Sequence, residues 1–244
     1  HRPLLIAPDS EYSVDGYRRV MFYTRPDGLF AEFTKIEYLV PEEKLGQLIW
    51  SLYETRHLLA EFEQYRVEEG DQIRDILVCT HGAVDAACAK FGYPLFKTLR
   101  EDYANEALRV WRVSHFGGHV FAPTVMDMPV GHYWAYVEAQ QADQIVMRSG
   151  DRSAMKGHYR GWAGIERGFL QVAECELWQL HGWQWFDALK SGEVVTQEDS
   201  PEPTWADVRI HYKLNATMPE TTATMRVEIS HTIETNPSTG KDHS

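Results

Sequence analysis

The apolar positions of the first seventy residues predict a β-hairpin followed by a helix. Residues 19–24 and 30–40 carry apolar side chains in strand-like runs, and residues 25–28, Arg-Pro-Asp-Gly, are typical of the turn between them. From residue 41 to about residue 66, apolar side chains recur at helical spacing. The proline and two glutamates that open this stretch suit a helix start.

The middle third alternates between strand and helix patterns. Residues 73–79 contain a continuous apolar run that predicts a buried strand, and Asp85 can cap a helix that runs to about Tyr103. We expect Pro94 to break or restart that helix. Three strands and one short helix are then predicted, at residues 108–113, 120–125, 133–137 and 142–147.

The last third predicts a helix and a strand pair. Residues 165–189 are mostly helical in pattern, with Gly182 as an interruption, and residues 200–203 read as a linker. Two alternating runs are typical of half-buried strands: Val208, Ile210, Tyr212 and Leu214, and then Met225, Val227, Ile229 and Ile233.

Taken together, these patterns predict the α/β class, with a thioredoxin-like α/β unit in residues 71–150. Residues 1–70 are expected to form a hairpin plus a helix that packs on this core. Residues 151–244 are expected to supply a helix and a strand pair that pack with the N-terminal part. Additional strands and helices from both ends would thus surround the middle unit.

Composition narrows the class of protein. The 244 residues are 43% hydrophobic and 25% charged, which is ordinary for a globular chain. No run of about 18 apolar residues is present, so we expect no membrane insertion. The net charge of −12 is the wrong sign for a phosphate-binding surface, so nucleic acid is not expected as a partner. Three cysteines do not make a disulfide scaffold, which indicates a reducing compartment, the cytoplasm.

Two cysteines and two histidines of the middle third are candidate metal ligands. Cys79 ends a predicted strand and Cys88 lies in the first turn of the next helix, where the helix dipole favours thiolate. His115 and His119 are four positions apart, and the two glycines between them favour a tight loop over a helix. Bare glycine amides in such a loop can approach an anionic ligand or sulfide closely.

The simplest alternative is two core thiols and two unrelated loop histidines, since a reduced cysteine packs as a small apolar residue. The glycine-flanked histidine pair in the same predicted unit favours a metal. Zinc suits a Cys₂His₂ set, although the C-x₂₋₄-C spacing of zinc fingers is absent. The other metal candidate is a [2Fe–2S] cluster with two cysteines on one iron and two histidines on the other.

Other residues compete weakly for these roles. His81 is a rival ligand, but a hydrogen bond next to the site or simple exposure is the favoured interpretation. Cys175 is expected to pack within a helix. No C-x-x-C motif supports thiol–disulfide chemistry, and no Walker or dinucleotide glycine motif supports a bound nucleotide or flavin.

Several segments resemble the sucrase/ferredoxin-like family, a group of thioredoxin-like ferredoxins. The similar segments are residues 79–82 (CTHG), 85–92 (DAACAKFG) and 114–124 (SHFGGHVFAPT). Residues 159–162 (YRGW) and 182–185 (GWQW) look like its bacterial and cyanobacterial members, and the resemblance runs from about residue 73 to 186. Ala87 departs from the family, where many relatives have a second adjacent cysteine.

The resemblance implies a cofactor and a set of functions. It implies that Cys79 and Cys88 bind one iron of a [2Fe–2S] cluster and that His115 and His119 bind the other. The favoured function is an electron carrier for a redox partner protein, with possible coupling of electron to proton through the histidines. A reductase of ferric siderophores is the second hypothesis and a zinc-stabilised binding module the third. The family label also implies sugar cleavage, but no catalytic carboxylate pair is identifiable.

Overall fold

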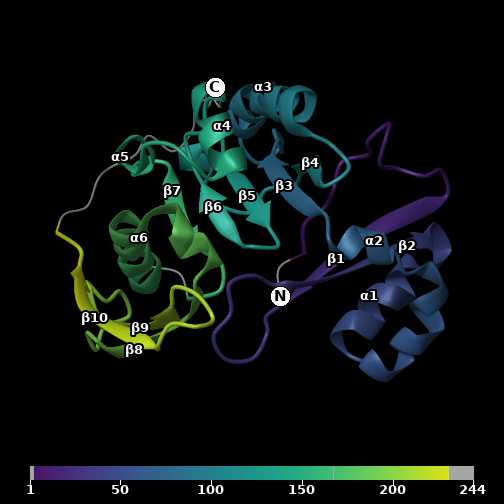
Figure 1. The fold of residues 1–244 in the computed structure, drawn as a ribbon. Helices are drawn as coiled ribbons and strands as arrows, with labels where there is room; N and C mark the ends of the chain where they lie inside the picture. Colours follow the sequence, from purple (N-terminus) through teal and green to yellow (C-terminus); the bar gives the residue numbers. More distant parts are fainter. Residues whose placement is uncertain (1–2, 167, 231–244) are drawn as a thin grey trace.

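The centre of the molecule is a five-stranded mixed sheet (Figure 1), seen in a computed structural model that describes residues 3–166 and 168–230. The strand order is β4 (Leu108–Val113), β3 (Arg74–Cys79), β5 (Val125–Met128), β6 (His132–Trp134) and β7 (Tyr159–Trp162). β3 and β4 are parallel, and the other neighbouring pairs are antiparallel. This mixed sheet with its helices confirms the predicted α/β class.

The parallel pair is joined by α3 (Ala86–Tyr103), as the sequence predicts. The side chain of Asp85 caps this helix by accepting a hydrogen bond from the Ala87 N–H at 2.8 Å. Pro94 lies inside the helix and does not end it, so the expected break is wrong. Burial of Leu95 and Leu99 against the sheet holds the helix together past the proline.

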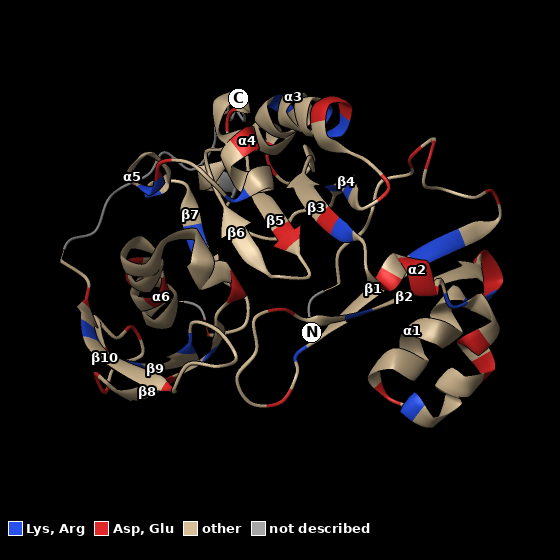
Figure 2. Cartoon of the chain, in the orientation of Figure 1, with Lys and Arg blue, Asp and Glu red and all other residues tan. Residues whose placement is uncertain are grey.

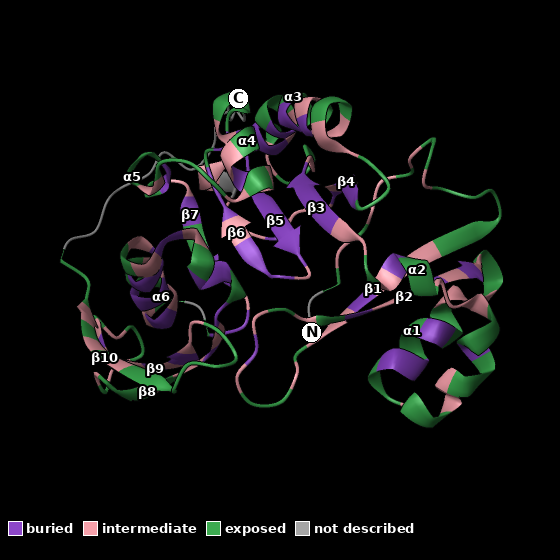
Figure 3. Cartoon of the chain, viewed as in Figure 1, coloured by how far each residue is buried: buried purple, intermediate pink, exposed green. Residues whose placement is uncertain are grey.

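The two faces of the sheet have different neighbours because successive strand residues point to opposite sides. Ile76 and Val78 pack among buried residues of α3, whereas Leu77 and Cys79 pack with Trp111 and side chains of the N-terminal third. Figure 3 shows β3 and β5 buried along most of their length. Helix α4 (Ala139–Met147) lies beside α3 (Figure 1).

Two of the predicted strands of this unit are displaced. Residues 119–121 form a 3₁₀ turn, η3 (His119–Phe121), and β5 begins only at Val125 and includes Asp127. A buried carboxylate is tolerated in β5 because the Arg74 guanidinium donates two hydrogen bonds to Asp127, both at 2.8 Å. β6 ends at Trp134, since Tyr136 has a φ of +51° and cannot continue a strand.

The N-terminal third forms a hairpin of β1 (Tyr17–Thr24) and β2 (Thr34–Pro41), followed by short helices. The single helix expected over residues 41–66 is wrong: it is divided into η1 (Glu42–Lys44), α1 (Leu45–Tyr53) and η2 (Arg56–Tyr65). Thr55 leaves the helical region with φ −129° and ψ 59°. The break lets Phe62 turn back onto the same small core as Leu48. Helix α2 (Glu68–Asp71) then leads into β3.

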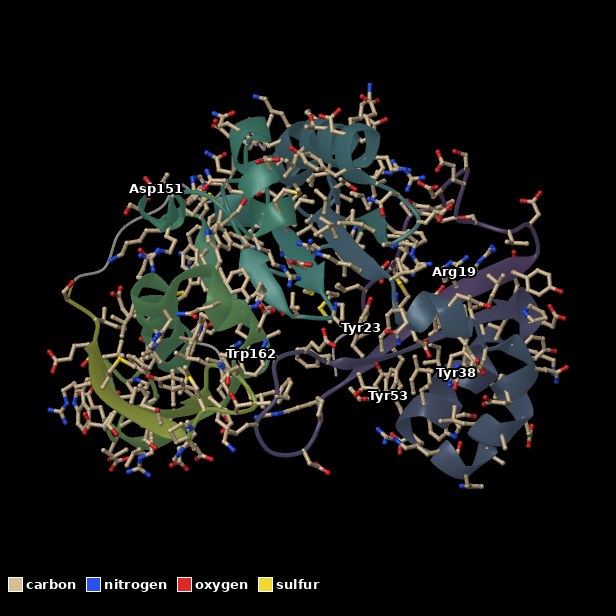
Figure 4. The ribbon with its side chains drawn as sticks, viewed as in Figure 1. Arg19, Tyr23, Tyr38, Tyr53, Asp151 and Trp162 are labelled. Carbon is tan, nitrogen blue, oxygen red and sulfur yellow. The ribbon has the colours of Figure 1, made fainter. Side chains whose placement is uncertain are left out.

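Buried hydrogen bonds and ion pairs connect the hairpin to the central sheet. Asp75 of β3 is fully buried and accepts hydrogen bonds from the Tyr23 hydroxyl at 2.9 Å and from Arg109 Nε at 3.0 Å. Lys35 of the hairpin pairs with the same carboxylate. Tyr23 of β1 is labelled in Figure 4, and Figure 2 shows charged residues within β3 and β5.

The C-terminal third forms a separate three-stranded sheet that packs against helix α6. It comprises α5 (Arg152–Met155), α6 (Phe169–His181), η4 (Gly182–Asp187), β8 (Leu189–Gln197), β9 (Trp205–Lys213) and β10 (Thr221–Glu228). The helix ends at His181 because Gly182 takes a φ of +75°, so the predicted interruption is confirmed and the predicted extension to residue 189 is wrong.

The strand predicted around Val208 and Ile210 is confirmed as β9, whose neighbours are β8 and β10. The sequence patterns assigned no strand to β7 or β8. Ile233 lies outside the described residues. The backbones of Phe30 and Lys190 exchange two hydrogen bonds, at 3.3 and 3.0 Å, and so join the N- and C-terminal thirds. The division at residues 70 and 150 stays a prediction.

Among the described residues, none of the helices has both the length and the apolar character that are needed to span a bilayer.

Candidate metal centre

Cys79 and Cys88 meet at the end of β3. Cys79 is the last residue of that strand, and its N–H donates to the Thr124 carbonyl at 3.1 Å. Cys88 lies in the first turn of α3, and both thiols are free and fully buried. Helix and strand approach closely here because residue 92 is glycine: a Cβ at Gly92 would lie 2.1 Å from the Cys79 carbonyl oxygen.

His115 completes a cluster of three donors. Its Nδ1 atom lies 3.8 Å from Cys79 Sγ and 3.9 Å from Cys88 Sγ, and all three ligand atoms lie within 4.8 Å of one another. Gly117 and Gly118 follow with φ of +104° and +73°, which ordinary residues rarely adopt. The loop predicted between His115 and His119 is therefore confirmed.

The two thiols differ in acidity because they share a proton. A hydrogen bond from the Cys88 thiol, followed by bonds from the His81 backbone and His115, lowers the pKa of Cys79 to about 5. The same hydrogen bond and burial raise the pKa of Cys88 far above its ordinary value. One thiolate is therefore ready to bind a metal, and a metal must displace the proton on the second sulfur.

The chemistry of these donors fits a metal centre. Thiolate and imidazole ligands select zinc or iron–sulfur clusters over hard cations such as Mg²⁺ or Ca²⁺. The surroundings are apolar: Trp111, Val113, Phe116 and two methionines are buried in one cluster with both cysteines. Three of the four predicted ligands are thus brought together by β3, α3 and the loop after β4.

A comparison with models of protein families identifies the family of the chain. The model of the sucrase/ferredoxin-like family matches residues 8–161, which include all four predicted ligands. The protein belongs to the sucrase/ferredoxin-like family. The same comparisons found no matching protein of curated function and no matching solved structure.

The fourth ligand that the family resemblance implies stays a prediction. His119 is the first residue of η3, four positions after His115, and its side chain lies outside the described part of the structure.

His81 and Cys175 lie outside the three-donor cluster. His81 Nδ1 accepts a hydrogen bond from the backbone N–H of His115 at 3.3 Å, which matches the predicted role next to the site. Cys175 lies on α6, half-buried, with its Sγ 3.9 Å from the Tyr159 carbonyl oxygen. Burial raises the pKa of the Cys175 thiol, as expected for a packing residue.

Sequence reasoning missed Gly92 as a site residue of this family member. Glycine within a helix costs about 1 kcal/mol relative to alanine. Its presence four residues after Cys88 was therefore the available signal of a close approach.

Proposed function

We propose that this family member is a [2Fe–2S] electron carrier whose ligands are Cys79, Cys88, His115 and His119. The observation that supports this best is the position of His115 Nδ1, nearly equidistant from the two cysteine sulfurs at 3.8 and 3.9 Å. The resemblance to the family supplies the cluster type and the fourth ligand. When bound, such a cluster supplies one-electron transfer, at a potential that histidine ligands raise relative to four thiolates.

The cysteine and histidine side chains have different roles in the proposed centre. Cys79 and Cys88 provide thiolates, and the low pKa of Cys79 readies one of them at neutral pH. His115 faces the sulfurs with Nδ1, so Nε2 is the ring atom that can hold a proton. This arrangement supports the proposed coupling of electron to proton, since a histidine ligand can gain or lose its outer proton whereas a thiolate cannot.

The burial of the site supports outer-sphere electron transfer. Trp111, Phe116 and their apolar neighbours exclude water from the sulfurs on the side of the sheet. The segment between the two cysteines is open to solvent, with Gly82, Ala83 and Val84 exposed. A redox partner protein is the proposed partner on that side.

Colour and composition of the purified protein test the proposal. Protein prepared without oxygen should be red-brown and contain about two irons and two acid-labile sulfides per chain. Cys79→Ser should lose both, and the matched variant Cys175→Ser should keep them. Stoichiometric zinc without sulfide would overturn the proposal in favour of a zinc-stabilised module.

A second measurement separates the carrier from a reductase. Reduced protein should pass its electron to ferric chelates slowly and without saturation, because a carrier has no substrate site for them. Saturable turnover of a ferric siderophore would instead show a reductase that uses the same centre.

A further inference from the structure

A groove of about 310 Å³ lies between α3 and the segment that follows the histidine loop. Lys90, Phe91 and Pro94 form one wall, and Pro123 and Tyr136 belong to the other. A volume near 300 Å³ is at the small end of small-molecule binding sites, which are mostly apolar with a few polar groups. The groove is therefore large enough for a compact ligand of one or two rings.

Exposed aromatic rings on both sides of the groove determine the kind of ligand that the groove can bind. Phe91 is 42% exposed and Tyr136 is 44% exposed, although both are large apolar side chains. Tyr136 and Phe121 form a T-shaped pair, with ring centroids 5.7 Å apart, which restrains the Tyr136 ring. Rings that face a groove suit a planar aromatic ligand, because aromatic pairs gain energy beyond simple burial of area.

The backbone at Tyr136 is strained in a way that favours this interpretation. Its φ of +51° is in the left-handed region, where a bulky residue is an outlier and glycine is not. Neighbouring backbone hydrogen bonds hold it there, from Tyr136 N–H to Phe121 at 2.9 Å and from Ala135 N–H to His158 at 2.8 Å. A tyrosine kept at such a position indicates that its ring has a use, since strained residues concentrate at functional sites.

The charged side chains of the groove determine the charge of the ligand that it can bind. The Lys90 ammonium lies 5.2 Å from the centroid of the Phe91 ring, and no carboxylate pairs with it within the described part of the chain. Glu138, the acid of the groove, keeps its negative charge, but its carboxylate is held at the start of α4 by the capping box and by Gln140 Nε2 at 2.6 Å, where the positive end of the helix dipole offsets that charge. Lys90 is thus the cation left for a ligand.

We propose that this groove binds a small planar aromatic anion, of the aryl carboxylate class, with its ring between Phe91 and Tyr136 and its acidic group at Lys90. Lys90 is two residues beyond Cys88, and Pro123 precedes Thr124, whose carbonyl binds the Cys79 N–H. The groove is therefore connected to the metal centre through α3 and through residues 123–124. Binding itself does not depend on which metal the centre holds.

Titration of the full chain with 2-naphthoate, followed by ligand-observed NMR and calorimetry, tests the site. The neutral isostere 2-naphthylmethanol should bind more weakly than the anion. Lys90→Met should weaken 2-naphthoate about tenfold and leave the alcohol unchanged, since only the anion makes a charge-assisted contact. Absence of 2-naphthoate binding at millimolar concentration, or equal effects of Lys90→Met on both probes, would overturn the proposal.

Variants of the aromatic walls give an independent test. Tyr136→Gly should abolish binding while its melting temperature stays above that of Tyr136→Ala, because glycine relieves the strain that alanine keeps. Phe91→Ala should also lose binding. Trp50→Ala is the control, because Trp50 is 61% exposed on α1 and does not line the groove. If Trp50→Ala weakened binding as much as Phe91→Ala did, the probe would be binding non-specifically and the proposal would fail.

Discussion

His81 Nδ1 accepts a hydrogen bond from the backbone N–H of His115 at 3.3 Å, and the backbone of His81 bonds to the sulfur of Cys79. One residue therefore connects the cysteine loop to the histidine loop. Such outer contacts fix the orientation of metal ligands, and their loss costs about 10–100-fold in metal affinity.

With the proposed iron–sulfur cluster bound, His81→Ala should release iron to a chelator at least about tenfold faster than the wild-type protein, because the His115 loop loses its anchor. The rate is measured from the decay of the visible spectrum. His81→Asn keeps a side-chain acceptor and should show an intermediate rate. Equal rates for the wild-type protein and His81→Ala would show that this hydrogen bond has no part in holding the centre.

Gly92→Ala should destabilise the protein and disturb the centre together. An added Cβ would lie 2.1 Å from the Cys79 carbonyl oxygen, so α3 and β3 must move apart. We expect a loss of about 1–3 kcal/mol in the free energy of unfolding by urea, together with a lower content of the proposed cluster.

Gly46→Ala is the matched control for this substitution. Gly46 lies on α1, and a Cβ there would meet nothing within 4 Å. It should raise the free energy of unfolding by about 0.5–1 kcal/mol, because alanine is the better helix former. If the two variants were equally stable, the close approach of α3 to β3 would be dispensable.

Cys175→Ala should leave the centre intact. The thiol lies on α6 and packs at the edge of the main core, away from the cluster of Cys79 and Cys88. The expected cost is about 1 kcal/mol in the free energy of unfolding, from a small packing loss. Cys88→Ala, which also removes a buried thiol, should lose the iron of the proposed cluster. Iron and sulfide analysis of both variants decides between them, and loss of iron from Cys175→Ala would contradict the assignment.

Local patterns were sufficient where a residue's role depends on its neighbours in sequence. The apolar run of β3 and the capping Asp85 placed Cys79 at a strand end and Cys88 in a first helical turn, and the structure shows both there. The paired glycines after His115 predicted a loop for the same reason. The order of strand, helix and strand from β3 through α3 to β4 followed from these assignments.

Local patterns were insufficient where a distant partner decides the structure. Asp127 was expected in a connection, yet it lies in β5 because Arg74, 53 residues away, neutralises it. β6 ends early where the Tyr136 N–H donates to the Phe121 carbonyl and the Ala135 N–H to the His158 carbonyl, contacts that the sequence does not reveal. The strands β7 and β8 carry glycine and polar residues and depend on pairing with β6 and β9, respectively.

A buried acid and a buried base in the C-terminal third predict a dependence of stability on pH. Glu174 of α6 accepts hydrogen bonds at one oxygen from the Tyr159 hydroxyl at 2.9 Å and from Trp185 Nε1 at 2.7 Å. Burial raises the pKa of Glu174 to about 7. Burial also lowers the pKa of Lys190 to about 8, partly offset by the charge of Glu174.

The two pKa shifts have opposite effects on stability as the pH rises. Between pH 4.5, the ordinary pKa of the acid, and pH 7, the folded protein keeps a proton on Glu174 that the unfolded chain has lost, so stability falls as pH rises. Between pH 8 and pH 10.5, the unfolded chain keeps a proton on Lys190 that the folded protein has lost, so stability rises with pH. This pair therefore contributes a minimum of stability between pH 7 and 8.

Glu174→Gln should remove the fall in stability between pH 4.5 and pH 7. Glutamine keeps a carbonyl oxygen for the bonds from Tyr159 and Trp185, so the packing is preserved and only the titration is lost. The wild-type protein should lose about 3 kcal/mol more than the variant in the free energy of unfolding between pH 4.5 and pH 7.5. Urea denaturation of both proteins across this range measures the difference, in which the titrating groups that do not interact with Glu174 cancel. Parallel curves for the two proteins would mean that Glu174 is already ionised in the folded state at pH 4.5, in spite of its burial.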